Sequence, residues 1–94
     1  MPKLDKQGRL KIPFDFRTRL ISQNNKNIAI CYDISRIILL NSNQTNNAKI
    51  IAFRKIDEKG RISLPKEAFS IMNATKNSTF IVYSQNLNIY IEAL

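Results

Sequence analysis

Short apolar stretches recur along this chain, each bounded by charged or turn-forming residues. Residues 9–12 and 61–64 alternate a charged or polar residue with an apolar one, which is the pattern of a half-buried strand. Residues 49–56 are rich in β-branched and aromatic side chains and predict a further strand. The remaining apolar runs predict two β-hairpins, 28–32 with 36–40 turning at 33–35, and 79–84 with 87–91 turning at 85–86. The pattern indicates a mainly β protein.

A proline follows each alternating strand and is suited to open a short helix, because its missing N–H would be unpaired in a first helical turn. Pro13 therefore opens a helix over residues 13–21, and Pro65 opens one over residues 65–72. The apolar residues of each helix share one face. They are Phe16, Leu20 and Ile21 in the first helix, and Ala68, Phe69 and Met72 in the second.

The chain consists of two copies of one unit. A shift of 52 residues places residues 3–13 on residues 55–65 without a gap. A short unit cannot usually bury its apolar face alone, and 94 residues hold too little core for two domains. The strand at 49–56 has only a short counterpart in the first copy, expected at a sheet edge, because Pro2 cannot donate to a ladder. We predict a single domain, 1–94, made of repeat one (1–40), a polar linker (41–47) and repeat two (48–94).

Both copies contain an Asp-x-x-Gly turn before the alternating strand. Asp can hold such a turn through its own backbone, and glycine tolerates positive φ at its last position. The two glycines of these turns are the only ones in the chain. Structural roles are therefore expected for the turn and strand-end residues Asp5, Gly8, Pro13, Asp57, Gly60 and Pro65.

The positive charge follows the repeated motif. Fifteen Lys and Arg against seven Asp and Glu give a net charge of +8. Eleven of those cations fall in residues 3–19 and 54–66: Lys3, Lys6, Arg9, Lys11, Arg17, Arg19, Arg54, Lys55, Lys59, Arg61 and Lys66. A scattered excess would indicate only a solvated, soluble surface, whereas a repeated cluster favours a polyanionic partner.

Several function classes lack their residues in this sequence. The chain has no histidine, no metal-ligand cluster and no glycine-rich phosphate loop, so we expect no enzyme activity, no cofactor and no small-molecule substrate. Its single cysteine, Cys31, lies in an apolar run and is expected to be a buried small hydrophobe. No apolar run approaches the roughly 18 residues of a membrane span, and no signal segment precedes the first repeat, so we expect no membrane partner and a cytoplasmic location.

The motif Asp-x-x-Gly-Arg-apolar-x-apolar-Pro, followed by a short helix and a hairpin, resembles the AbrB/SpoVT (MazE-like) swapped-hairpin DNA-binding domain family, also called the looped-hinge fold. Two copies in tandem resemble the MraZ arrangement. The resemblance implies a swapped-hairpin β-barrel, formed as an intramolecular pseudo-dimer of two β-β-α-β-β-type repeats. Six apolar residues are expected in the shared core: Ile12, Ile30, Ile38, Leu64, Val82 and Ile89.

The resemblance also implies a function, that of a sequence-preferring transcriptional regulator that binds double-stranded DNA through basic hinge loops and associates with the nucleoid. Arg9 and Arg61 match the family's loop arginine, and Arg54 matches a basic residue that repeat one replaces with Pro2. Arg17 matches a helix arginine of some family members, where repeat two has Phe69. The expected DNA contacts are Lys3, Lys6, Arg9, Lys11, Arg17, Arg54, Lys55, Lys59, Arg61 and Lys66, the lysines mainly on phosphates.

Other interpretations remain open. The differences between the two copies also suit a protein-interaction module, or a partner of another AbrB-like regulator, that has lost specific DNA reading; exposed Phe14 and Phe69 would favour it, buried ones a plain core. RNA binding has less support, because no paired aromatics stand on alternate strand positions beside basic residues. The loop arginines could instead pair with Asp5 and Asp57 to hold the turns. A monomer or a weak homodimer is expected, the latter with hairpins exchanged across the linker.

Overall fold

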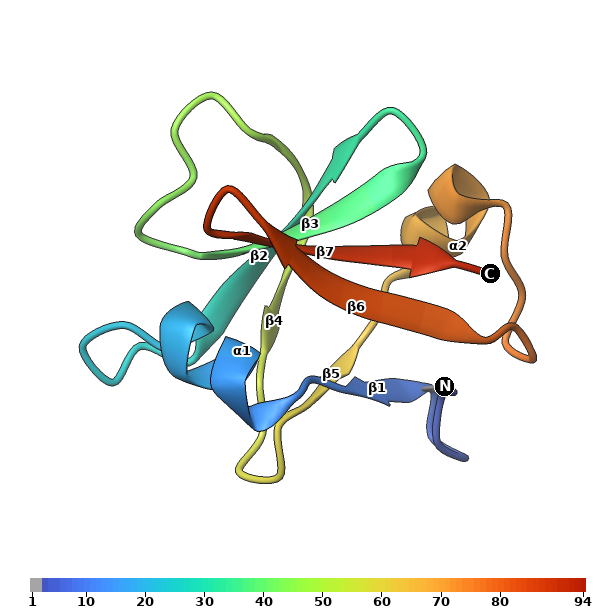
Figure 1. Ribbon diagram of the computed structural model, residues 1–94, viewed down its shortest axis with the longest axis horizontal. Helices are drawn as coiled ribbons and strands as arrows, with labels where there is room; N and C mark the ends of the chain where they lie inside the picture. The colour runs from blue at the N-terminus through green and yellow to red at the C-terminus, as the bar shows by residue number, and fades with distance from the viewer. Residues whose placement is uncertain (1–2) are drawn as a thin grey trace.

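The computed structural model describes residues 3–94 as an arrangement of antiparallel strands with two short helices (Figure 1). The expected consequence of Pro2 for pairing lies outside the described residues. Chain order is β1 (Arg9–Lys11), α1 (Phe14–Leu20), β2 (Asn27–Asp33), β3 (Arg36–Asn41), β4 (Lys49–Lys55), β5 (Arg61–Ser63), α2 (Lys66–Met72), β6 (Phe80–Gln85) and β7 (Asn88–Ala93). The strands and helices predicted by residue range are confirmed, with bounds shifted by one or two residues, whereas the short counterpart of 49–56 expected before the first turn is, within residues 3–94, an isolated bridge at Lys3.

A five-stranded antiparallel sheet joins the two halves of the chain. Its strand order is β4-β2-β3-β7-β6, so the hairpin β2–β3 and the hairpin β6–β7 meet where β3 pairs with β7. Strand β4 crosses to the first half and pairs with β2, which places Lys55 opposite Asn27. Lys3 lies opposite Thr79 in an isolated bridge, at positions 52 residues from that pair. The sheet is open, with β4 and β6 at its edges, and no pairing within residues 3–94 closes a barrel.

Strands β1 and β5 form a separate two-stranded ribbon that links the halves a second time (Figure 1). Leu10 lies opposite Ile62 in this antiparallel pair, and both side chains are fully buried. Because side chains alternate along a strand, the neighbours of these two residues lie on the opposite face of the ribbon. The ribbon therefore has one face on the core and one face outward.

The hydrophobic core takes residues from both halves of the chain. Of the six residues expected there, Ile12, Ile30, Leu64 and Ile89 are buried in the core and Val82 packs against it. The prediction for Ile38 is wrong. Strand β3 directs Ile37 and Leu39 into the core, and Ile38 lies on the other face opposite Tyr90. Four consecutive apolar residues gave no alternation from which the buried face could be chosen.

The two helices cover the core with the faces that the sequence predicts. Leu20 is buried in α1, as are Ala68 and Met72 in α2. Phe69 packs against the core and meets Phe80 edge to face, with ring centroids 6.3 Å apart. No helix among residues 3–94 is long and apolar enough to cross a membrane.

Two boundaries differ from the prediction. Asn41, expected at the start of the linker, is the last residue of β3 and is almost completely buried. The turn of the second hairpin lies at Asn86 and Leu87, one residue later than expected, and both have positive φ. The first hairpin turns at Ile34 and Ser35, within the predicted range.

Candidate nucleic-acid interface

The outward face of the β1–β5 ribbon carries three cations. Arg9 lies opposite Ser63, and Lys11 lies directly opposite Arg61. Like charges facing each other across a strand pair repel, so the ribbon itself gains nothing from this pair. Lys11 is exposed, and the Arg9 and Arg61 side chains are 27% and 28% accessible. This face can therefore receive an anion that relieves the repulsion.

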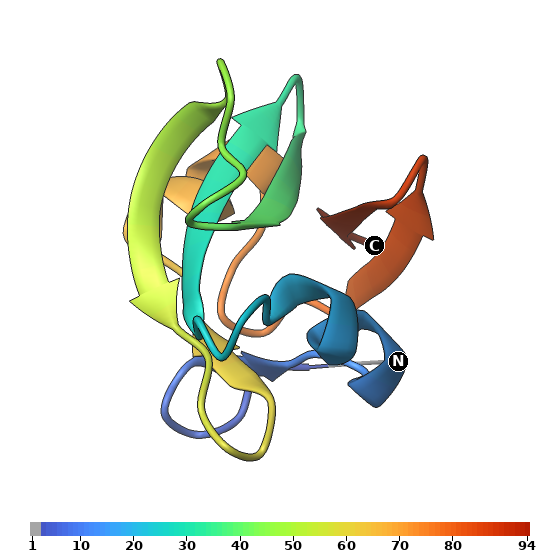
Figure 2. The ribbon, with the colours of Figure 1, turned by 90° about the vertical axis from the view of Figure 1, so that its left-hand side faces the viewer.

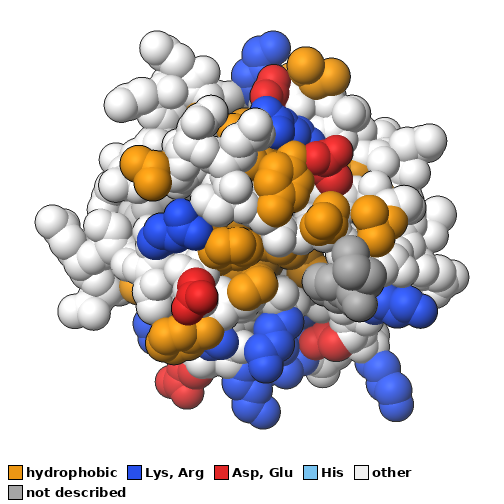
Figure 3. All heavy atoms as spheres, viewed as in Figure 1, with side chains coloured by type: hydrophobic (Ala, Val, Ile, Leu, Met, Phe, Trp, Pro, Cys, Tyr) orange, Lys and Arg blue, Asp and Glu red, His pale blue; other side chains and the backbone are white. Residues whose placement is uncertain are grey.

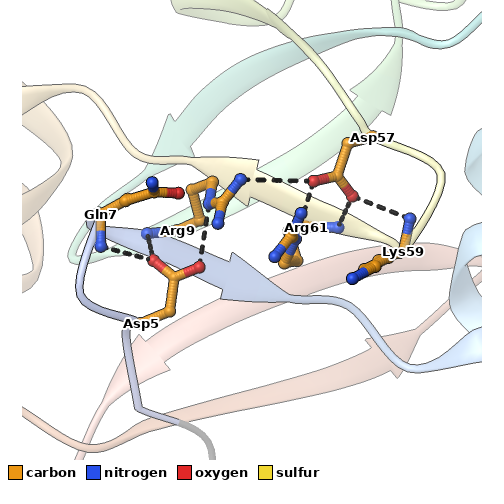
Figure 4. Close-up of polar contacts among 6 residues, drawn as sticks. All are labelled: Asp5, Gln7, Arg9, Asp57, Lys59 and Arg61. Atoms are coloured by element: carbon orange, nitrogen blue, oxygen red, sulfur yellow. Dashed lines mark hydrogen bonds and ion pairs between the residues drawn. The ribbon is translucent and has the colours of Figure 1, made fainter.

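Asp5 organises the turn that leads into β1. One carboxylate oxygen accepts hydrogen bonds from the backbone N–H groups of Gln7 and Arg9, each at 2.9 Å. The other accepts a hydrogen bond from Arg9 Nε at 2.9 Å (Figure 4). Gly8 closes the turn by donating to the Asp5 carbonyl at 3.0 Å, with φ +78°. The turn thus positions the Arg9 side chain as well as its own backbone.

The turn before β5 repeats this geometry. Asp57 accepts hydrogen bonds from the backbone N–H of Lys59 at 3.0 Å and of Arg61 at 2.8 Å, and from Arg61 Nε at 2.7 Å (Figure 4). Arg9 Nη1 reaches across from the other half to within 3.7 Å of an Asp57 carboxylate oxygen. Both turns project from the same end of the molecule (Figure 2). The arginine–aspartate ion pairs considered from the sequence are therefore present in both copies.

These contacts keep both aspartates charged. The pKa of Asp5 is lowered, mainly by the hydrogen bond from the Arg9 backbone N–H, and the pKa of Asp57 is lowered in the same way by Arg61. Each carboxylate offsets part of the charge of its arginine. It also holds the guanidinium in one orientation through Nε.

The other expected contacts divide between the turns and positions off the ribbon. Lys6 and Lys59 are exposed at the two turns, and Lys11 is exposed at the end of β1. Lysine and arginine side chains gather along the lower part of Figure 3, where Figure 1 places the ribbon and its turns. The remaining residues lie on other elements: Lys3 at the bridge to Thr79, Lys55 at the end of β4, Lys66 at the start of α2, and Arg54 on β4, where its Nη1 donates to the Phe53 carbonyl.

The two turns differ in what covers them. A Cβ atom added to Gly60 would lie 2.4 Å from Cδ and Nε of Arg17, whereas one added to Gly8 would meet nothing within 4 Å. The Arg17 side chain, from α1, therefore lies directly over the second turn. Its Nε is buried with no hydrogen-bond partner among residues 3–94, and its guanidinium carbon lies 5.2 Å from the centroid of the Phe14 ring.

Exposure of Phe14 and Phe69 would favour a protein-binding role, and the two residues differ in exposure. Phe14 is 66% exposed, while Phe69 packs against the core. The position equivalent to Arg17 is thus occupied by a phenylalanine that packs against the core, which explains why nothing covers Gly8. The two copies share their turns but not their helix surfaces.

The fold also brings beside the turns two lysines that lie outside the repeated motif. Lys26 precedes β2 and lies with Lys55 along one hollow, and Lys76 precedes β6 and lies with Lys6 along another. Only the pairing of strands from different halves brings them there, so a self-comparison of the sequence gives no signal for them.

Other reactive groups lie away from this surface. Cys31 is buried, and burial raises the pKa of its thiol. Within residues 3–94, no group of three or more Cys, Asp or Glu side chains could hold a metal ion. Comparison of the chain with models of protein families, with curated proteins and with solved structures found no match.

Proposed function

We propose that this protein is a double-stranded-DNA-binding transcriptional regulator of the AbrB type, and that its basic ribbon and turns form the DNA contact. The observation that carries the proposal is the juxtaposition of Arg9, Lys11 and Arg61 on one outward face, at the point where the two halves pair. Cations gathered across a strand pair and only partly offset by Asp5 and Asp57 are unfavourable in the free protein and favourable against a polyanion.

We also propose that the two repeats form an intramolecular pseudo-dimer of the swapped-hairpin kind. Two features support this architecture. The β1–β5 ribbon pairs equivalent segments of both copies, and the strand leading into each turn pairs with the other copy, at Lys55 with Asn27 and at Lys3 with Thr79. A second chain is then not needed to complete the binding face.

The geometry suits duplex DNA. A two-stranded ribbon fits the major groove, where arginine forks can bond base edges or phosphates in pairs. The carboxylates of Asp5 and Asp57 hold each arginine through Nε, so less side-chain freedom is lost on binding. Lysines at the turns contribute charge on phosphates, which sets position more than sequence preference.

The test is fluorescence anisotropy with labelled random and AT-rich duplexes over a salt series. If about six phosphates are neutralised, log K falls with log salt with a slope of about five. The double variant Arg9→Ala/Arg61→Ala should lose tight binding. Because these arginines also hold the turns, Lys11→Ala is the companion variant: it removes one ribbon charge that makes no ion pair among residues 3–94. No binding by the folded wild type at low salt would refute the proposal.

A protein-interaction role is the second candidate, and exposed apolar side chains favour it. Phe14 is 66% exposed, and Ile50 and Phe53 are exposed on the edge strand β4. Light scattering of the wild type and of Phe14→Ser tests self-association through the α1 surface. A larger species in the wild type alone, without DNA binding, would favour this function over the first.

A further inference from the structure

Two hollows flank the turns, one on each side of the ribbon. The first has a volume of about 490 Å³ and is lined by residues 24–27 with Lys55. An adjoining hollow of about 280 Å³ shares Lys26 and Lys55 and extends to Asp57 and Glu58. The second has a volume of about 500 Å³ and is lined by residues 4–8 with Lys76 and Asn77.

The hollows are equivalent under the 52-residue repeat. Residues 24–27 of the first correspond to 76–79, and residues 55–58 correspond to 3–6. Each hollow therefore lies between the turn of one copy and the loop of the other. The two halves must be folded together for either hollow to exist.

Positive charge recurs in both hollows although the sequence positions do not match. The first has Lys26 on its loop wall and Lys55 on its turn wall, while the second has Lys76 and Lys6. The repeat equivalents of Lys26 and Lys55 are Ser78 and Lys3, so neither pair is a simple copy of the other. Each hollow therefore has a pair of lysines that the other copy does not supply at the matching positions, and Lys6 itself corresponds to Glu58.

The loop walls are held in place before any ligand binds. The Ile56 N–H donates to the Lys26 carbonyl at 3.0 Å, and the Asn25 side chain donates to Ser42 Oγ at 2.9 Å. In the other loop, the Thr75 N–H donates to Ser78 Oγ at 2.9 Å. A ligand therefore meets walls whose backbone is already ordered, which lowers the entropic cost of binding.

The lysines of the hollows are not neutralised within residues 3–94. Every ion pair found there joins an arginine to an aspartate, and none involves a lysine. Asp5 and Asp57, the aspartates of the turns, are occupied by arginine and by backbone N–H groups. Glu58, the other acidic residue of the second turn, is exposed and lines the adjoining hollow.

We propose that the two hollows bind backbone phosphates of duplex DNA on either side of the ribbon, Lys26 with Lys55 on one side and Lys76 with Lys6 on the other. This inference rests on the proposed function and extends its footprint to two lysines outside the repeated motif. The phosphate contacts are then twofold, although the helix surfaces beside the turns are not.

The test is the salt dependence of duplex binding by Lys26→Gln/Lys76→Gln. Glutamine keeps most of each side chain and removes its charge. Each lost phosphate contact lowers the slope of log K against log salt by about 0.9, so the double variant should lose about 1.8 units of slope. The loss should be equal for random and AT-rich duplexes, as for phosphate contacts in general. Lys26→Arg/Lys76→Arg should keep the wild-type slope.

Lys49→Gln is the matched control for the single variants Lys26→Gln and Lys76→Gln, each of which should lower the slope by about 0.9. It removes one charge from β4 at a point outside the hollows, where the ammonium lies 5.7 Å from the centroid of the Tyr32 ring. Its slope should equal that of the wild type. If it lowers the slope as much as Lys26→Gln does, the effect belongs to the overall field and the hollows are not sites.

The outcomes separate the two proposals. An unchanged slope in Lys26→Gln/Lys76→Gln, together with loss of binding in Arg9→Ala/Arg61→Ala, would overturn the hollows and leave the ribbon contact standing. No binding by the wild type would overturn both. Thermal melts of each variant establish that the compared proteins are folded; the Lys26 group that bonds Ile56 is the backbone carbonyl, which the substitution leaves in place.

Discussion

Asn41 is the buried polar residue whose removal should cost the most stability. It is 1% exposed, and its amide is fully bonded. Its Nδ2 donates to the Leu20 carbonyl at 2.7 Å and to the Asn25 carbonyl at 2.9 Å. Its Oδ1 accepts from the Asn25 side chain at 3.2 Å and from the Asn43 N–H at 3.1 Å. One side chain therefore ties the end of α1 and the following loop to strand β3.

The magnitude follows from the groups that Asn41→Ala leaves without partners. Asn43 is exposed and water can replace its bond, and the Asn25 side chain keeps its bond to Ser42. The main cost is the buried Leu20 carbonyl, at about 1–3 kcal/mol when unpaired, and the partly buried Asn25 carbonyl adds a smaller cost. We expect a loss of about 3 kcal/mol, from a total of roughly 5–14 kcal/mol for a chain of this length.

Urea denaturation followed by circular dichroism measures this loss as a lower midpoint at constant slope. Asn41→Asp is the sharper variant, because it turns a donor into a carboxylate facing two carbonyl oxygens. It should be less stable than Asn41→Ala at neutral pH and recover part of the loss on acidification, when protonation restores one donor. Asn43→Ala is the exposed control and should change stability by less than about 0.5 kcal/mol. An Asn41→Ala variant within about 0.5 kcal/mol of the wild type would refute the reasoning, since surface substitutions reach that value.

Two further predictions concern the turns. Gly60→Ala and Gly8→Ala should each introduce backbone strain of about 1–2 kcal/mol, because both glycines have a φ of +78°. Only Gly60→Ala also displaces Arg17, so it should be the more destabilising of the two in urea denaturation. That difference should vanish in an Arg17→Ala background, and equal losses in the wild-type background would contradict the contact. The lowered pKa values of Asp5 and Asp57 mean that their stabilising effect is present above about pH 4 and is lost as the pH falls through the lowered values. Asp5→Asn/Asp57→Asn should therefore flatten the acid limb of the stability curve, and an unaltered limb would show that the turns do not depend on these charges.

The strands, helices and turns could be predicted because their signals are local. Alternation with period two, proline after the strand and Asp-x-x-Gly at the turn each lie within a few residues. Ile38 could not be placed, because the apolar run around it has no alternation and pairing of Ile37 with Ile91 decides the face. Asn41 could not be distinguished from the asparagines that follow it, because its partners are Leu20 and Asn25, far back in the chain.

The same distinction applies to the candidate site. Arg9 and Arg61 could be paired with Asp5 and Asp57 from sequence because each pair is separated by four residues. No such short spacing links Lys26 to the turn residues. This lysine reaches the second turn only because β4 crosses to β2, a pairing between halves that no local pattern encodes.

The two copies thus agree in some parts of the surface and differ in others, and the difference has a consequence for recognition. The turns and the hollows recur in both halves, and under the proposed function their lysines hold phosphates, which carry no sequence information. The helix beside the second turn presents Arg17, whereas the equivalent helix position, Phe69, is part of the core packing. Arg9 and Arg61 therefore recur in both halves, whereas the additional guanidinium of Arg17 stands beside the second turn only. Under the proposed function, the contacts of the turns and hollows are then twofold and the helix contact is one-sided, so the DNA site should not need to be a palindrome.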